Sequence, residues 1–380
     1  MNKINVIVGT NNFGLGPVGK VSSIINVSKD KFNWYACGNE FDLNIFKSGT
    51  FKDKLFSKDK EKIEDFVTKY DIKYAVVVLD VVLAKILLSL NVKVIFVDSL
   101  PFMWTQADID EGLLPLDATV YCAQKCINLT DASKKVLKQI TNLKWVNPIQ
   151  NFSDGKYRPF KELYNVLNVG GLHSPIGNGE SYIYTVIIPI VKYFMNHNEK
   201  LIITCGSNAK NSINNVLDKL EIKNNNLKVS TLKQQDFIST IINSNIFITS
   251  PGLTTIYETS SLNKPTIIIP PQNLSQFYNI EYAKKILNKY KTMNWETEKL
   301  NLTYLGKILD KGETFVVDKI YEYITELVNT KYDDEFYRRF ENILKENYAN
   351  KIKSNFNING NGADDIKDEL FNLIGEDKNV

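Results

Sequence analysis

The sequence has few of the residues that bind metals or form disulfide bonds. It contains two histidines and four cysteines, Cys37, Cys122, Cys126 and Cys205, and no cysteines stand in a C-x-x-C pair. These features argue against a Cys/His zinc site and against a disulfide framework. We therefore expect a cytoplasmic protein with reduced thiols that uses no metal and no resident cofactor.

An excess of charge and a long hydrophobic run are also missing. Lys and Arg number 46 against 43 Asp and Glu, a net charge of +3, too balanced for a protein whose affinity comes from nucleic-acid phosphates. The longest apolar stretch, residues 75–90, is interrupted by Asp80 and Lys85, which makes it unsuited to crossing a bilayer. The N-terminus enters an apolar strand without a signal-peptide pattern. We expect neither a nucleic-acid partner nor a transmembrane segment.

The chain does have enough residues for two domains, since 380 residues correspond to about two units of roughly 150 residues. Short apolar runs alternate with helix-like segments in both halves, which is typical of βαβ units and parallel sheets. We expect two Rossmann-like α/β domains facing each other across a cleft, at residues 1–150 and 151–330. A helical extension over residues 331–380 should pack back on the first domain. The predicted strands are residues 4–8, 32–36, 74–79, 92–97 and 119–122, then 164–169, 201–204, 227–229, 246–249 and 266–269.

A glycine-rich stretch follows the first predicted strand. Gly14, Gly16 and Gly19 fit the dinucleotide pattern G-x-G-x-x-G, and residues 14–20 fit G-x-x-x-x-G-K, with Val21 where a Mg²⁺-binding Ser or Thr belongs after Lys20. Such a loop brings backbone N–H groups and a helix N-terminus to an anion or an acceptor molecule. A plain strand-to-helix turn and a nicotinamide site both remain open interpretations.

A second polar stretch follows the predicted strand at residues 246–249. It begins Ser250-Pro-Gly252 and continues into a helix with Thr254, Thr255 and Glu258. The glycine lets a ligand approach the backbone, and the helix N-terminus favours a phosphate. Glu258, which we expect on the exposed face of the first turns, has two oxygens that could accept from ribose hydroxyls.

Two glutamines, Gln272 and Gln276, follow the next predicted strand. Because the carboxyl ends of parallel strands meet at one edge of a sheet, they should lie beside the Ser250–Glu258 segment. Their amides suit the hydroxyl groups of a sugar.

This run resembles the donor-nucleotide signature of GT-B glycosyltransferases, especially the peptidoglycan UDP-N-acetylglucosamine transferase. That signature is a Gly, a Thr, a ribose-binding Glu six residues after the Gly, and a Gln-rich loop ending near an aromatic-Asn pair. Here its residues are Gly252, Thr255, Glu258 and the run Gln276-Phe-Tyr-Asn279. The resemblance implies an inverting glycosyltransferase with a UDP-sugar as co-substrate.

Two further segments support the same resemblance. Gly170 and Gly171, followed by His173, are similar to the glycine loop that meets the diphosphate, and His173 could donate to a diphosphate oxygen. Asn147-Pro-Ile resembles the interdomain crossing of these enzymes. The resemblance thus covers both halves of the chain in order.

The first half is expected to bind the acceptor. Phe13 lies nearest the place where the peptidoglycan enzyme carries a His, and the Gly14–Lys20 loop is closer to the cytosylglucuronate synthases, which join UDP-glucuronate to cytosine or hydroxymethylcytosine. Asp98 ends a predicted strand, so we expect it to be the catalytic base, with Phe102 and Trp104 as a stacking wall for the acceptor. Asp80 directly precedes a predicted helix and should be its N-cap.

Two alternatives from other classes remain. A nicotinamide-dependent oxidoreductase would use the Gly14–Gly19 loop, but would leave the Gly252–Glu258 signature without a role. A non-catalytic nucleotide-sugar-binding protein would keep the donor site and lack a base.

Overall fold

The computed structural model describes residues 3–11, 16–39, 43, 46, 48–125, 129–150, 164–170, 172, 179–232, 234–262, 264–286, 291–349 and 360–378. The chain divides into two compact units. The first holds Met1–Ser153 and Ile358–Val380, and the second holds Asp154–Asn357. Each unit contains its own parallel sheet with helices, which confirms the predicted pair of Rossmann-like domains. None of the helices in the described ranges combines the length and apolar character that a membrane crossing requires.

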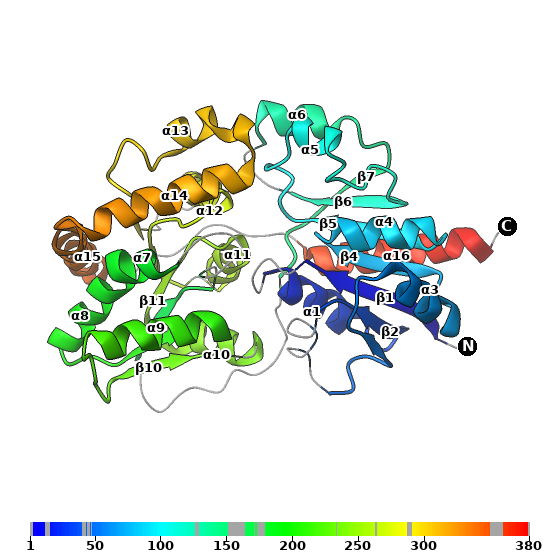
Figure 1. Cartoon of the computed structure of the whole chain (residues 1–380). Coiled ribbons are helices and arrows are strands. Elements are labelled where there is room, and N and C mark those ends of the chain that lie inside the picture. Colours follow the sequence, from blue (N-terminus) through cyan, green and yellow to red (C-terminus); the bar gives the residue numbers. More distant parts are fainter. Residues whose placement is uncertain are drawn as a thin grey trace. The chain divides into compact units, whose positions relative to one another are not determined.

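The first unit is built on a seven-stranded parallel sheet with the order β3-β2-β1-β4-β5-β6-β7 (Figure 1). Its strands are β1 (Ile4–Thr10), β2 (Phe32–Cys37), β3 (Lys54–Leu55), β4 (Tyr74–Val78), β5 (Lys93–Asp98), β6 (Val120–Gln124) and β7 (Leu143–Val146). The strand order reverses between β1 and β4, and open α/β sheets bind ligands outside the carboxyl ends of the strands at such a point.

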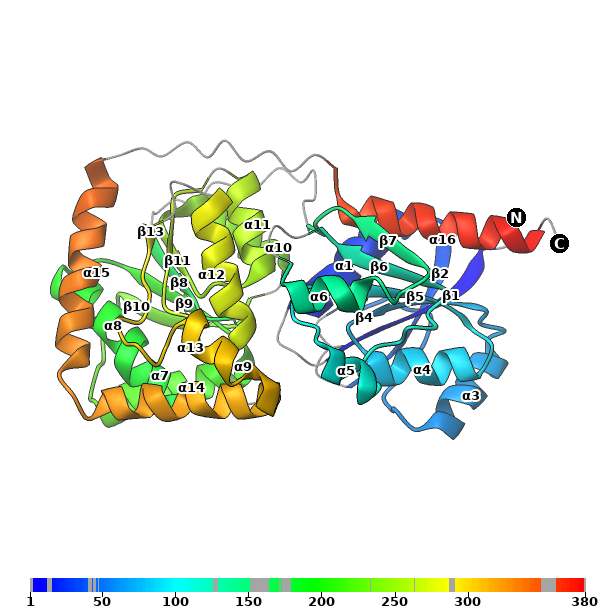
Figure 2. The same ribbon diagram turned by 90° about the horizontal axis from the view of Figure 1, so that it is seen from above.

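Helices cover both faces of this sheet. In Figure 2, α16 (Gly362–Lys378) lies on one side, and α3 (Lys60–Lys69) and α4 (Val81–Ser89) lie on the other. Helix α1 (Gly16–Ser28) contacts α16. Because side chains alternate along a strand, Val76 and Val78 enter the core under α1 and α16, while their neighbours enter the core under α3, α4 and α6 (Asp131–Leu137). Burial on both faces explains why the central strands are continuous apolar runs.

The second unit has a six-stranded parallel sheet with the order β10-β9-β8-β11-β12-β13. Its order reverses between β8 and β11, so the equivalent binding position lies beyond the ends of these two strands. The strands are β8 (Tyr164–Asn168), β9 (Leu201–Thr204), β10 (Leu227–Ser230), β11 (Ser244–Thr249), β12 (Thr266–Ile268) and β13 (Lys291–Thr292). The helical segments are α7 (Glu180–Tyr182), the π-helical η1 (Ile183–Ile187), α8 (Ile188–Asn196), α9 (Ser207–Lys219), α10 (Gln234–Asn243), α11 (Leu253–Ser261), α12 (Leu274–Ile286), α13 (Leu302–Lys307), the 3-10 turn η2 (Leu309–Lys311), α14 (Glu313–Val328) and α15 (Tyr332–Ala349).

The helices after residue 330 do not all follow the prediction. Helix α15 packs on α8 and η1 of the second unit (Figure 2), so it is not part of an extension that packs on the first unit. The reason is its apolar stripe of Phe336, Phe340 and Leu344, which is fully buried. The ring of Phe340 lies 5.4 Å from that of Tyr193 and 6.0 Å from that of Phe194.

Helix α16 does return to the first unit, where side-chain hydrogen bonds fix its N-terminus. Asn147 donates to Asp365 Oδ2 from its backbone nitrogen at 2.7 Å and from Nδ2 at 2.9 Å. Asn361 both accepts from the Gln150 N–H and donates to the Gln150 carbonyl, each at 3.2 Å. The Asn-Pro segment that the sequence marks as a crossing is therefore bound directly to the start of the returning helix.

Candidate functional site

The carboxyl edge of the second sheet is polar at its centre. The last residues of β8, β9 and β11 are Asn168, Thr204 and Thr249, which lie side by side in the sheet and are all buried. Asn168 Nδ2 donates to Thr249 Oγ1 at 3.0 Å, and Thr204 Oγ1 donates to Asn168 Oδ1 at 3.2 Å. Sequence reasoning missed this group, although a polar residue ending each of several apolar strands is a visible signal.

The turn after β11 leads directly into helix α11. The Gly252 N–H donates to the Ser250 carbonyl at 2.7 Å, and Gly252 is the N-cap residue, with no side chain to cap the helix. Among the described residues, a Cβ placed on Gly252 would have only Thr255 Oγ1 within 4 Å, at 3.9 Å. The protein itself therefore leaves room beside this glycine, as a site for a ligand at a helix N-terminus requires. Thr254 and Thr255 lie half-buried in the first turn, as expected.

Glu258 lies further along the same helix and differs from the prediction in its environment. It is 1% exposed, so the expected exposed position is wrong. The helix places it on the buried side with its neighbours Tyr257 and Thr259. A buried carboxylate needs partners for its charge, so its replacement affects folding as well as any ligand.

The two glutamines after β12 have different surroundings. Gln276 Oε1 accepts from the backbone N–H of Gln272 at 3.0 Å. Both polar atoms of the Gln272 side chain are buried and have no hydrogen-bond partner within the part of the chain that the structure describes. Leaving a buried polar group unpaired costs about 1–3 kcal/mol. Gln272 is therefore the glutamine with unused hydrogen-bonding capacity.

Not every predicted donor residue can be placed. Gly170 is half-buried two residues after the end of β8, and a Cβ on it would lie 3.6 Å from Asn168 Oδ1. Gly171 and His173 lie outside the described residues. Their predicted contact with a diphosphate stays a prediction.

In the first unit, the predicted acceptor loop is described only in part. Phe13 and Gly14 lie outside the described residues. Gly16 and Gly19 belong to helix α1 and not to the loop before it, and Lys20 is 4% exposed. Lys20 therefore has almost no exposed surface for contact with an acceptor.

Asp98 has a structural role in this unit. It is fully buried, and its Oδ1 accepts from the Leu100 N–H at 2.8 Å. Its Oδ2 accepts from Trp104 Nε1 at 2.7 Å and from the Tyr121 hydroxyl at 2.9 Å. Burial raises the pKa of Asp98 to about 6. The three hydrogen bonds lower this pKa, the one from Trp104 most, but their effect is smaller than that of burial. With both oxygens engaged, Asp98 anchors the loop that follows β5, and this geometry does not favour the predicted general base.

The predicted stacking wall is also turned inward. Phe102 is 5% exposed, and Trp104 is half-buried against the core under α3 and α4, with its indole N–H bound to Asp98. Asp80, by contrast, is the predicted N-cap. It accepts from the Leu83 N–H at 3.1 Å and forms an ion pair of 2.8 Å with Lys58.

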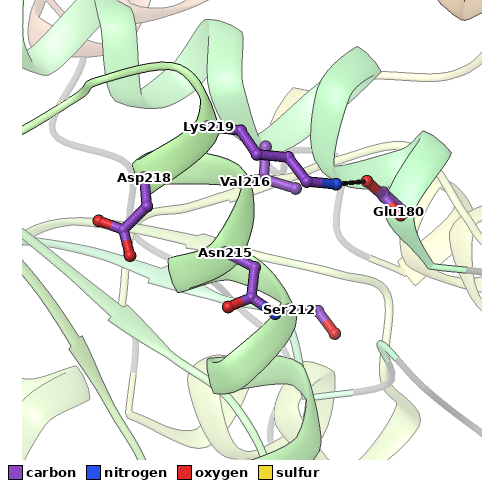
Figure 3. Close-up of a pocket in the computed structure, with 6 residues that line it drawn as sticks. All are labelled: Glu180, Ser212, Asn215, Val216, Asp218 and Lys219. Carbon is purple, nitrogen blue, oxygen red and sulfur yellow. Dashed lines mark hydrogen bonds and ion pairs between the residues drawn. The ribbon is translucent and has the colours of Figure 1, made fainter.

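A pocket of about 310 Å³ lies elsewhere on the second unit. It is lined by α9 and the start of α7, namely Glu180, Ser212, Asn215, Val216, Asp218 and Lys219 (Figure 3). A Lys219–Glu180 ion pair of 2.8 Å crosses it between two largely exposed side chains. The α9 residues that line the pocket come from the middle and the C-terminal turns of this helix, away from its N-terminus, which follows the carboxyl end of β9.

Comparison with known proteins distinguishes between the glycosyltransferase and the oxidoreductase that the sequence analysis considers. Residues 179–318 match the model of the glycosyltransferase family 28 C-terminal domain. The second unit carries a glycosyltransferase domain. This range contains the whole Ser250–Asn279 segment, and it favours the predicted glycosyltransferase over the nicotinamide-dependent oxidoreductase. None of the curated proteins matches the sequence.

Solved structures with a similar fold are numerous but distant in sequence. Staphylococcus aureus MnaA, in a structure with UDP, is 14% identical with a TM-score of 0.55, and the match covers 94% of this chain and 100% of that one. The UDP-GlcNAc 2-epimerase of Methanocaldococcus jannaschii, with UDP-GlcNAc and UDP, is 14% identical with a TM-score of 0.52, over 91% and 100% of the two chains. At this identity, the likeness establishes the two-domain fold.

Proposed function

We propose that this protein is a glycosyltransferase that binds a UDP-sugar at the carboxyl edge of the second sheet and transfers the sugar to a small acceptor. The observation that carries the proposal is the arrangement around the β8–β11 switch point within a glycosyltransferase-type domain. Among the residues that the structure describes, this edge of the sheet has a helix N-terminus without a side-chain cap, a glycine with open space beside it, and the side-chain amide of Gln272 without a hydrogen-bond partner.

Each group has a role in this proposal. The N-terminus of α11 and its dipole bind the diphosphate and stabilise the charge that develops on it as the sugar leaves. Glu258 accepts from the ribose hydroxyls, and Gln272 binds hydroxyls of the sugar and so uses its unpaired amide. His173, which follows β8 in the sequence, donates to a diphosphate oxygen.

The acceptor side is the finer part of the proposal. The first unit binds the acceptor at the carboxyl edge of its own sheet, and transfer inverts the configuration at the anomeric carbon, because the acceptor attacks opposite the leaving diphosphate. No metal takes part, and UDP-glucuronate with a cytosine-type base is the proposed substrate pair.

A thermal-shift panel tests the donor. A ligand that binds only the native state adds about 2.7 kcal/mol of stability at 100 times its Kd. UDP and UDP-sugars should raise the melting temperature, whereas NAD, NADP and ATP should not. Stabilisation by NAD equal to that by UDP would remove the proposal.

Product analysis tests the reaction. UDP-glucuronate with cytosine and UDP-GlcNAc with a lipid-linked muropeptide represent the two families that the sequence resembles. A new glycoside with release of UDP supports transfer. Conversion of a UDP-sugar to its epimer, without any acceptor, would instead assign the site to an isomerase.

A further inference from the structure

The polar side chains under the donor edge form one directed chain of hydrogen bonds. The Ser250 carbonyl can only accept, and Thr249 Oγ1 donates to it at 2.8 Å. Thr249 must then accept from Asn168 Nδ2, which leaves Asn168 Oδ1 to accept from Thr204. The direction is therefore fixed along its whole length from β9 to the turn after β11.

The turn at residues 250–252 is held from several other sides. The Ser250 N–H donates to the Asn168 carbonyl at 2.9 Å, and the Gly252 N–H shares the Ser250 carbonyl with Thr249. From α12, Asn279 Nδ2 donates to the Pro251 carbonyl at 2.9 Å. Asn168 thus contacts this turn through its backbone directly and through its side chain by way of Thr249.

A series of polar side chains is unusual inside a parallel sheet that is buried on both faces. Parallel strands buried on both faces are usually Val- and Ile-rich, and replacing both partners of a buried hydrogen bond by apolar groups of similar shape can be nearly neutral. Asn168 is buried between two threonines where an aliphatic side chain would pack. Fixed backbone donors, by contrast, matter for binding and transition-state charge, because they need no rearrangement when the charge appears.

We propose that Asn168 and Thr249 are positioning residues for the nucleotide diphosphate. This inference rests on the proposed function. The series of hydrogen bonds Thr204–Asn168–Thr249–Ser250 fixes the turn that begins α11, so that the N–H groups of this turn face the diphosphate before the ligand arrives. Neither side chain touches the ligand. Their effect is on the phosphate part of the nucleotide and not on the nucleoside.

The test compares the affinities of UDP and uridine for three variants. Thr249→Val removes the hydroxyl, Thr249→Ser keeps it, and Asn168→Leu removes the bridge between β9 and β11. We expect Thr249→Val and Asn168→Leu to bind UDP about tenfold more weakly than the wild type, a loss comparable to the free energy of one hydrogen bond. Their affinity for uridine should be unchanged. Thr249→Ser should bind UDP like the wild type.

Thr266→Val is the matched control. Thr266 is also buried, in the adjacent strand β12, but it is the first residue of that strand and its hydroxyl donates to Lys264 at the opposite edge of the sheet. It should leave both affinities unchanged. Equal losses for UDP and uridine, or none in folded Thr249→Val protein, would overturn the inference. If Asn168→Leu fails to fold, the Thr249 pair still decides it, and absence of UDP binding by the wild type would reject the proposed function instead.

Discussion

Glu258 combines burial with a charge, which changes what its replacement measures. Because it is 1% exposed, truncation to Ala would leave a cavity and would confuse folding with binding. Gln has nearly the same shape and removes only the charge. If Glu258 accepts from the ribose hydroxyls, Glu258→Gln should weaken UDP binding by roughly 10- to 150-fold, as expected for a charged hydrogen bond.

Calorimetry with UDP and with 2′,3′-dideoxy-UDP isolates this contact. The dideoxy ligand should bind the wild type weakly, and Glu258→Gln should cause little further loss, because the partner hydroxyls are already missing. Glu180→Gln, at the exposed start of α7, controls for a change of charge on the same unit. Additive losses from the variant and the ligand would show that Glu258 does not contact the ribose.

Asp98 permits a prediction about pH. Its pKa is about 6 in the folded protein and 3.8 for the free group, so the folded state binds the proton more tightly. Its contribution to stability is present at low pH and is lost as the pH rises from about 4 to about 6, by roughly 3 kcal/mol. Asp98→Asn cannot ionise, so wild-type protein should lose stability relative to this variant over that range.

Urea unfolding at pH 4, 5, 6 and 7 measures this difference. At low pH the variant should be the less stable of the two by about 1–3 kcal/mol, because an amide cannot accept from all three donors of Leu100, Trp104 and Tyr121. A difference that does not change with pH would contradict the burial argument. Unchanged UDP affinity with turnover lowered about 10²–10⁴-fold would return Asp98 to the mechanism as the base.

At the scale of the element, the start of α16 contains a glycine that packs closely against backbone of the first unit. A Cβ on Gly362 would lie 2.0 Å from the Asn147 carbonyl oxygen, whereas a Cβ on Gly375 in the same helix would meet nothing within 4 Å. Gly362→Ala should therefore destabilise the protein by at least about 1–3 kcal/mol. Gly375→Ala should stabilise it by as much as about 1 kcal/mol, because Ala is the better helix former. Thermal unfolding of both variants checks the sign, and equal effects would show that α16 does not dock through its N-terminus.

The central elements could be predicted from the sequence, whereas the edges could not. The strands buried on both faces are long apolar runs, so β1, β4, β5 and β11 were identified. Strands β3 and β13 have two residues each, too few to show a period. Helix α12 begins at Leu274, so Gln276 and Asn279, which the resemblance places in a Gln-rich loop, lie on a helix. Asn273 caps this helix by accepting from the Gln276 N–H. The Asn-x-x-Gln spacing is a capping signal that could have located this start.

The candidate site was predictable where residue type determines the role. Gly252 and Gln272 stand in loops whose position follows from strand order, and their chemistry is evident from the sequence. The inward positions of Glu258, Lys20 and Phe102 depend on how helices and loops pack. Packing of this kind involves contacts between distant parts of the chain, which a local pattern does not contain.

At the scale of the whole molecule, the two units have the same type of sheet, each with a reversal of strand order, and the match to the glycosyltransferase family 28 C-terminal domain lies in the second, where we propose the donor site. Saturating UDP should therefore slow hydrogen exchange in the second unit, at the ends of β8 and β11 and along α11. Amides that exchange only from states unable to bind should slow by about 100-fold at 100 times the Kd. The core amides of β1, β4 and α16 belong to the first unit and should keep their exchange rates.

Mass spectrometry of peptic fragments measures both sets of amides in one experiment, with NAD at the same concentration as the control. Equal slowing around β1 and α1 would place a nucleotide at the glycine-rich segment of the first unit, and the assignment of donor to the second sheet would then be wrong.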